Sequence, residues 1–265
     1  NQQAETYIDF AGTCMNLEQL DDALQYLEAA DKLLKSFPDN RLRARITCRE
    51  GYLNLLYSNY SGAMELLLEA DKTIATLDTP LTLKDYYFLT LIHSGLGKVY
   101  EHNDDREKSV LAYQKVVDMC ETMGIRTRLS WHYLNVGNGY AALNESEDAV
   151  AYYQRAIEVA DDTSEFARAS AYANLGFCYL EKEDHDEALK LFDRAEPLFK
   201  DGNEQDNYNL SIIATWRGQI FRARKQTALA HEHLKKALHY AELLQDNKQL
   251  AGVCKELASH YAEEA

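Results

Sequence analysis

The sequence predicts an all-α protein made of repeated helix-turn-helix units, and three observations support this prediction. The 265 residues include only three prolines, so few positions interrupt a helix. Hydrophobic residues make up 46% of the chain, which is enough to bury a core. Small residues also recur at one fixed spacing along the sequence, which is typical of stacked helical repeats.

The clearest copy of this spacing begins at Gly176. Ala188 follows after 12 positions, Phe192 after 16 and Ala195 after 19. The small residues let two helix backbones approach each other, and the bulky residue fills the space beside the contact. The small residue of the first helix, here called the anchor, recurs in this pattern at Ala11, Gly51, Gly97, Gly137, Gly176 and Gly218, and a partial seventh copy begins at Ala258.

The anchors predict the helices in order along the chain. The first helix of each pair is predicted at 3–16, 41–58, 82–102, 126–142, 165–181, 206–223 and 247–263. The second helix is predicted at 19–36, 61–76, 105–122, 145–161, 184–200 and 226–244. The turns between pairs are predicted from helix-breaking residues at Pro38, Pro80, Gly124 and Asp201-Gly202. Because no linker divides the chain, we predict a single domain over residues 1–265.

Several copies share a Leu-Gly-x-x-Tyr core in the first helix, as in Leu175-Gly176 with Tyr179, followed by spaced small and aromatic residues in the second. These residues resemble the tetratricopeptide repeat, and the resemblance covers nearly the whole chain. The anchors are 39 to 46 residues apart, whereas the usual repeat has about 34. Such long repeats resemble those of kinesin light chain, LGN/Pins and bacterial Rap-type regulators. The resemblance implies an α-solenoid of about six and a half repeats that forms a right-handed superhelix.

The resemblance also implies where a partner would bind. In this family the first helices line a concave face, and ligand-facing side chains lie mainly at six offsets from the anchor. The predicted partner is a protein or peptide segment. Transferred to this sequence, the offsets give Arg45, Arg49, Tyr52, Lys98, Glu101, Trp131, Asn135, Asn138, Asn174, Phe177, Thr215, Gln219 and Arg222.

Asn135 and Asn174 hold the same offset in adjacent repeats. An asparagine amide donates and accepts at once, so a row of them can hold the backbone of an extended peptide, which resembles the use in kinesin light chain and LGN/Pins. The alternative is that these amides bond only to neighbouring helices or water. Trp131, Phe177 and Tyr52 would add apolar subsites, although aromatic residues at helical spacing also belong to cores.

Arg41, Arg45 and Arg49 are spaced by four and share one helix face. Arg45 and Arg49 fall on the predicted concave side, where they could bind an acidic ligand through a carboxylate or phosphate. The alternative is that neighbouring acidic side chains of the chain itself neutralise them.

The net charge of −15 argues against nucleic acid and anionic membranes as partners. Five scattered cysteines predict reduced thiols in a cytoplasmic protein. We expect no enzyme, cofactor or metal site, because no catalytic motif is present and His231 and His233 lie on different sides of a helix.

The function predicted from these features is a protein- or peptide-binding scaffold. The alternative is a regulatory or sensor region of a larger bacterial signalling protein, such as a histidine kinase, diguanylate cyclase or transcriptional regulator. We expect the sequence to be a fragment of a longer protein, since it begins with Asn1. The sequence specifies neither the partner nor an oligomeric state.

Overall fold

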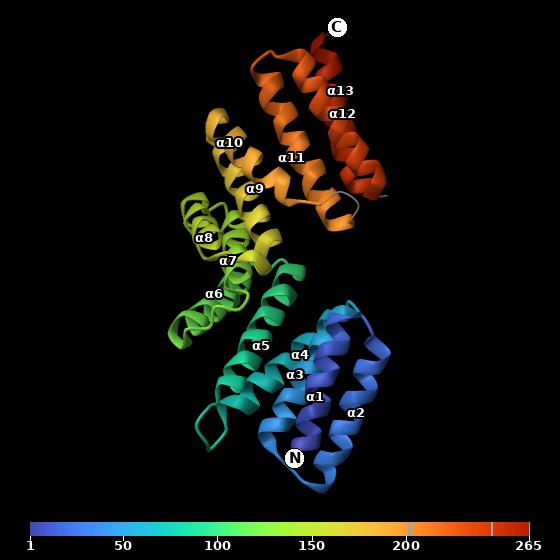
Figure 1. Ribbon diagram of the computed structural model, residues 1–265, viewed down its shortest axis with the longest axis vertical. Helices are drawn as coiled ribbons and strands as arrows, with labels where there is room; N and C mark the ends of the chain where they lie inside the picture. Colours follow the sequence, from blue (N-terminus) through green and yellow to red (C-terminus); the bar gives the residue numbers. More distant parts are fainter. Residues whose placement is uncertain (201–202, 245, 265) are drawn as a thin grey trace. The chain divides into compact units, whose positions relative to one another are not determined.

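The computed structural model describes residues 1–200, 203–244 and 246–264 (Figure 1). These residues form thirteen α-helices and two short 3-10 helices, joined by turns and without a strand. The prediction of an all-α fold is therefore confirmed. The turn predicted at Asp201-Gly202 lies outside the described residues.

The helices group into two compact units, Asn1–Thr127 and Arg128–Ala265. In the first unit each odd-numbered helix packs on the helix that follows it, and successive hairpins meet through α2 and α3 and through α4 and α5. The first helices α1, α3 and α5 also contact each other in turn. The six helices are α1 (Gln2–Asn16), α2 (Leu20–Ser36), α3 (Asn40–Leu56), α4 (Tyr60–Ala75), α5 (Leu83–His102) and α6 (Arg106–Met123).

The second unit repeats this arrangement. Helices α7, α9 and α11 pack on α8, α10 and α12, while α13 packs on α12 and α11. The first helices again form a row, because α7 contacts α9 and α9 contacts α11. The elements are α7 (Leu129–Ala142), α8 (Ser146–Val159), η1 (Asp162–Ser164), α9 (Glu165–Glu181), α10 (His185–Ala195), η2 (Glu196–Leu198), α11 (Glu204–Ala223), α12 (Thr227–Leu244) and α13 (Asn247–Glu264).

Each unit is thus a stack of hairpins, which is the predicted solenoid arrangement. That residues 1–265 make up one domain stays a prediction.

The anchor positions are the close contacts of the hairpins, as the repeat spacing predicts. A Cβ atom added to Gly176 would lie 2.6 Å from Cε1 of Phe192 and 3.3 Å from the carbonyl oxygen of Ala188. Ala188, Phe192 and Ala195 are completely buried. The absence of a side chain at Gly176 therefore lets α9 and α10 pack at this distance.

All six hairpin turns share one backbone conformation, and none of them uses a glycine for it. Seven residues after each anchor, one residue adopts the left-handed conformation with φ between 56° and 61°. The amide of the next residue then donates to a carbonyl oxygen in the last turn of the first helix, as Asp184 does to Tyr179 at 3.0 Å. The left-handed residues are Glu18, Ser58, Asp104, Asn144, Glu183 and Lys225.

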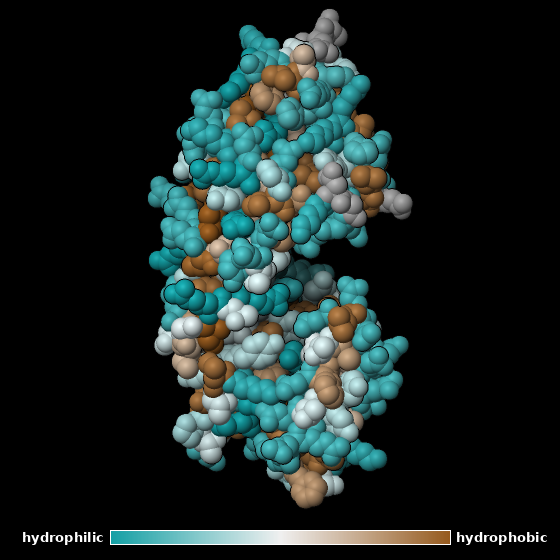
Figure 2. All heavy atoms as spheres, viewed as in Figure 1, coloured by the Kyte–Doolittle hydropathy of each residue, from teal (hydrophilic) through white to brown (hydrophobic). Residues whose placement is uncertain are grey.

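Hydrophilic side chains cover most of the surface of each unit that faces the viewer in Figure 2. Over the described part of the chain, no helix is long and apolar enough to cross a membrane. All five cysteines are free thiols, and Cys48, Cys120 and Cys178 are buried.

Candidate functional site

A groove of about 700 Å³ lies on the second unit and is lined mainly by the first helices α7, α9 and α11. Five side chains predicted from the family offsets line it together. Each belongs to α7 or α9, where helical periodicity places the offsets on one face. They are Trp131, Asn135, Asn138, Asn174 and Phe177.

The asparagines form the polar part of this groove. Oδ1 of Asn138 accepts a hydrogen bond from Nδ2 of Asn174 at 2.8 Å and another from the Tyr153 hydroxyl at 3.0 Å. Burial raises the pKa of Tyr153, so its hydroxyl keeps its proton and remains a donor. Asn138 and Asn174 therefore bond within the protein, as the alternative interpretation expects. The half-buried side chain of Asn135 makes no hydrogen bond to any described residue.

Two stacked aromatic pairs form the apolar part of the groove. Trp131 on α7 stacks on Phe166 of α9, with ring centroids 5.2 Å apart and planes inclined by 13°. Phe177 on α9 stacks on Trp216 of α11 at 4.7 Å and 25°. All four rings line the groove. Each pair joins two first helices, so these rings support the stack and present apolar surface at the same time.

Reasoning from the sequence did not select Phe166, Tyr208 and Trp216, although all three line the groove. Phe166 and Tyr208 each lie ten residues before an anchor, one helical turn beyond the farthest offset used. Extending the periodic face by that turn would have included both. Trp216 holds the offset that Asn135 holds in its repeat, and it interrupts the predicted row of asparagines.

Three other predicted residues, Tyr52, Lys98 and Glu101, line a separate hollow of about 520 Å³ on the first unit. The hydroxyl of Tyr113 donates to Oε2 of Glu101 at 3.0 Å. Tyr60 and His102 contribute a stacked ring pair to the same hollow, with centroids 3.6 Å apart.

Thr215, Gln219 and Arg222 lie on α11 outside the lining of the groove. The Thr215 hydroxyl donates to the carbonyl oxygen of Ser211 at 2.8 Å. The guanidinium of Arg222 forms an ion pair with Glu256 of α13 at 3.1 Å. Arg222 therefore connects α11 to α13, whereas the Thr215 hydrogen bond stays within α11.

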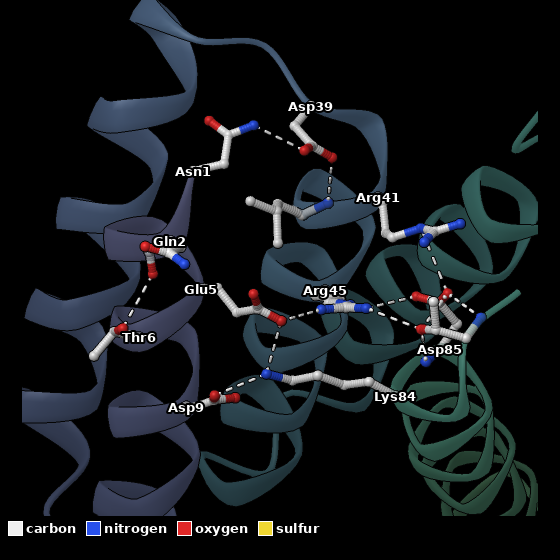
Figure 3. Close-up of polar contacts among 12 residues, drawn as sticks. Asn1, Gln2, Glu5, Thr6, Asp9, Asp39, Arg41, Arg45, Lys84 and Asp85 are labelled. Atoms are coloured by element: carbon white, nitrogen blue, oxygen red, sulfur yellow. Dashed lines mark hydrogen bonds and ion pairs between the residues drawn. The ribbon is translucent and has the colours of Figure 1, made fainter. Parts of the chain in front are cut away.

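Arg45 lies in an ion-pair network of the first unit (Figure 3). Only 4% of its side chain is exposed. Nη2 donates to Oδ1 of Asp85 at 2.8 Å and Nη1 to Oε1 of Glu5 at 2.7 Å. Lys84 joins the network through ion pairs with Glu5 at 2.9 Å and Asp9 at 2.8 Å. The neutralising acids that the alternative interpretation expects are thus present around Arg45.

Asp85 connects this network to the start of α5. Its side chain is fully buried, accepts a hydrogen bond from the Thr82 amide at 2.8 Å and closes a capping box with Thr82. Burial by itself would raise the pKa of Asp85. The hydrogen bonds from Thr82 and Arg45 outweigh that effect and hold the pKa below its usual value. Asp85 is therefore the charged partner of a buried guanidinium.

Arg49 is also buried, with 9% of its surface exposed. Its guanidinium carbon lies 5.1 Å from the ring centroid of Phe88 and 5.8 Å from that of Tyr87. These cation–π contacts place Arg49 in the packing between α3 and α5.

The described residues contain no group of three or more His, Cys, Asp or Glu side chains arranged to hold a metal ion.

Family models described as tetratricopeptide repeat match residues 133–165 and 167–242. Over these residues, which include most of the groove, the matches confirm the resemblance recognised from the Leu-Gly-x-x-Tyr core. A search of curated proteins gives no match to the sequence.

Solved structures share the fold at low sequence identity. BtubC (BKLC) from P. vanneervenii is 20% identical, with 92% of this chain and 93% of that chain covered and a TM-score of 0.66. The quorum sensor NprR from B. thuringiensis, in its apo form, is 15% identical, with coverage of 97% and 72% and a TM-score of 0.72. NprR in complex with its cognate peptide NprX gives 14% identity, coverage of 99% and 73% and a TM-score of 0.70.

A signal transduction ATPase from Pyrococcus horikoshii with a tetratricopeptide repeat sensor is 14% identical. The aligned part covers 98% of this chain and 42% of the ATPase chain, with a TM-score of 0.68. At these identities the similarity is one of fold.

Proposed function

Because this chain carries tetratricopeptide repeats between residues 133 and 242, we propose that it is a protein- or peptide-binding scaffold. The binding surface in this proposal is the groove on the second unit. One observation carries it: five residues selected from the family offsets line the same groove. The proposed ligand is a short extended segment of a partner protein or a free peptide.

The chemistry of the groove suits such a segment. The amide of Asn135 would accept a hydrogen bond from a peptide N–H and donate one to a peptide carbonyl. The Asn174–Asn138–Tyr153 hydrogen bonds fix neighbouring side chains before a ligand arrives, which lowers the entropy cost of binding. The aromatic pairs Trp131–Phe166 and Phe177–Trp216 would cover apolar side chains of the segment.

The comparisons support the ligand class. NprR shares the fold and has a peptide as its cognate ligand. A scaffold of this kind needs no catalytic residues, so the proposed role is not enzymatic. The proposed location is the cytoplasm, in keeping with five cysteines that are all free thiols.

A second candidate is a sensor region within a larger signalling protein. Its support is the fold similarity to the tetratricopeptide repeat sensor of the Pyrococcus horikoshii ATPase. An effector domain encoded next to this segment in the intact gene would favour this candidate.

The acidic ligand at Arg45 and Arg49 stays a prediction. The burial of both arginines and the ion pairs of Arg45 with Glu5 and Asp85 argue against it.

An mRNA-display selection of random dodecapeptides against the immobilised whole protein tests whether the groove binds peptides. Asn135→Ala should lower the affinity for a selected peptide about fivefold. The reason is that the Asn135 amide supplies one to two hydrogen bonds, which together contribute a net ~1 kcal/mol to binding. Asn103→Ala, an exposed asparagine in a turn of the first unit, is the matched control and should leave affinity unchanged. Equal affinities for the wild type and Asn135→Ala across the selected peptides would contradict the proposal.

A further inference from the structure

The groove on the second unit carries charge of one sign. Twenty described residues line it, and Glu181 is the only Asp, Glu, Lys or Arg among them. The other polar side chains are neutral amides, hydroxyls and one thiol. A ligand in the groove therefore meets a single protein charge, and that charge is negative.

Glu181 faces the groove from the end of α9. It is the last residue of that helix, four positions after Phe177, so the two share one face. Its side chain is exposed and forms no ion pair with a described residue, Lys182 at the helix end included. Among the described parts of the chain, nothing neutralises this carboxylate.

The position of Glu181 at the C-terminus of α9 also favours the binding of a cation. The carbonyl groups at the C-terminus of a helix carry partial negative charge, which opposes a carboxylate there and attracts a positive group. The sequence of the second unit adds 23 Asp and Glu against 15 Lys and Arg, so the longer-range field has the same sign.

We infer that the groove selects an extended peptide segment that carries a Lys or Arg side chain, and that Glu181 is the residue that receives it. The inference rests on the proposed function and adds the charge of the ligand to it. Phe177 and Glu181 are four positions apart in the helix, a rise of about 6 Å. An extended peptide covers about 3.3 Å per residue. The basic residue therefore falls within two positions of the apolar side chain that covers the Phe177–Trp216 pair.

The same dodecapeptide selection tests this inference. Peptides enriched on the wild-type protein should contain Lys or Arg within two positions of an aromatic or aliphatic residue more often than the input library. Glu181→Gln should lower the affinity for a fluorescein-labelled selected peptide about two- to fivefold, which is the usual range for loss of a partly exposed ion pair. Glu181→Lys should shift the selection toward Asp and Glu.

Glu183→Gln is the matched control. It removes the same charge two residues later, in the turn after α9 and outside the lining of the groove, so it should leave affinity unchanged. Changing the peptide's Lys to Gln should abolish the difference in affinity between wild type and Glu181→Gln. Together the two changes form a double-mutant cycle, which isolates the interaction between Glu181 and the peptide's Lys.

Two results would overturn the inference in distinguishable ways. Enrichment of neutral or acidic peptides that bind wild type and Glu181→Gln equally, yet weaken with Asn135→Ala, would overturn it and leave the proposed function standing. Selected peptides that bind independently of both Asn135 and Glu181 would overturn the proposed function and this inference together.

Discussion

The two units use equivalent positions of their first helices in opposite ways. Arg45 and Trp131 both lie six residues before an anchor, and Arg49 and Asn135 both lie two residues before one. In the first unit these positions are buried, with Arg45 paired to Glu5, which holds the same offset in the preceding repeat. In the second unit the corresponding side chains are uncharged and line a groove of about 700 Å³.

The difference follows from charge. Buried guanidinium groups need partners, so acids from adjacent repeats pack against Arg45 and the surface closes over it. Amides need hydrogen-bond partners but no counter-ion, and aromatic rings need neither, so both can remain half-buried around a hollow. A repeat register therefore predicts which side chains share a face, while their charge decides whether that face is closed by the protein itself.

Removing Asp85 should disturb the first unit most strongly. In Asp85→Ala the Arg45 guanidinium loses its buried partner and α5 loses its capping box. We expect the free energy of unfolding to fall by about 3–5 kcal/mol, measured by urea denaturation. Asp9→Ala, which removes a half-exposed partner of Lys84, is the control and should cost less than about 1 kcal/mol. Equal effects of the two variants would show that Arg45 does not depend on Asp85.

A smaller loss is expected at the contact between the two helices of one hairpin, α9 and α10, in the second unit. Gly176→Leu forces a side chain against Phe192 and the Ala188 carbonyl, which should lower the free energy of unfolding by about 1–3 kcal/mol. Gly252→Leu is the control, because a Cβ there meets no other atom within 4 Å. Thermal melts read by circular dichroism measure both, and an unchanged melt of Gly176→Leu would reject the helix contact at this anchor.

Much of the fold follows from the sequence because the anchors repeat in register. The helix predicted at 165–181 is Glu165–Glu181 in the structure. The prediction of a helix to residue 200 was wrong by five residues, since α10 ends at Ala195 and continues as a 3-10 turn that contains Pro197. The left-handed turn residues gave no signal in the sequence, because residues as different as Glu183 and Lys225 occupy them.

The candidate site was predictable only in part. The offsets from the anchors placed Trp131 and Asn135 among the predicted binding residues, because such offsets depend on helical periodicity alone. The partners of Arg45 were not predictable in this way. They come from α1 and α5, each 40 residues away, and the ion pairs depend on side-chain conformations that no spacing encodes.

The tryptophans give the most direct measurement of the central claim that the second unit's groove is the binding surface. The chain contains two, Trp131 and Trp216, and both line the groove, while the first unit has none. Titrating a selected dodecapeptide that contains no tryptophan into the whole protein should change intrinsic tryptophan emission saturably. The half-saturation point should match that from fluorescein anisotropy of the labelled peptide. Full saturation by anisotropy with unchanged tryptophan emission would contradict the account.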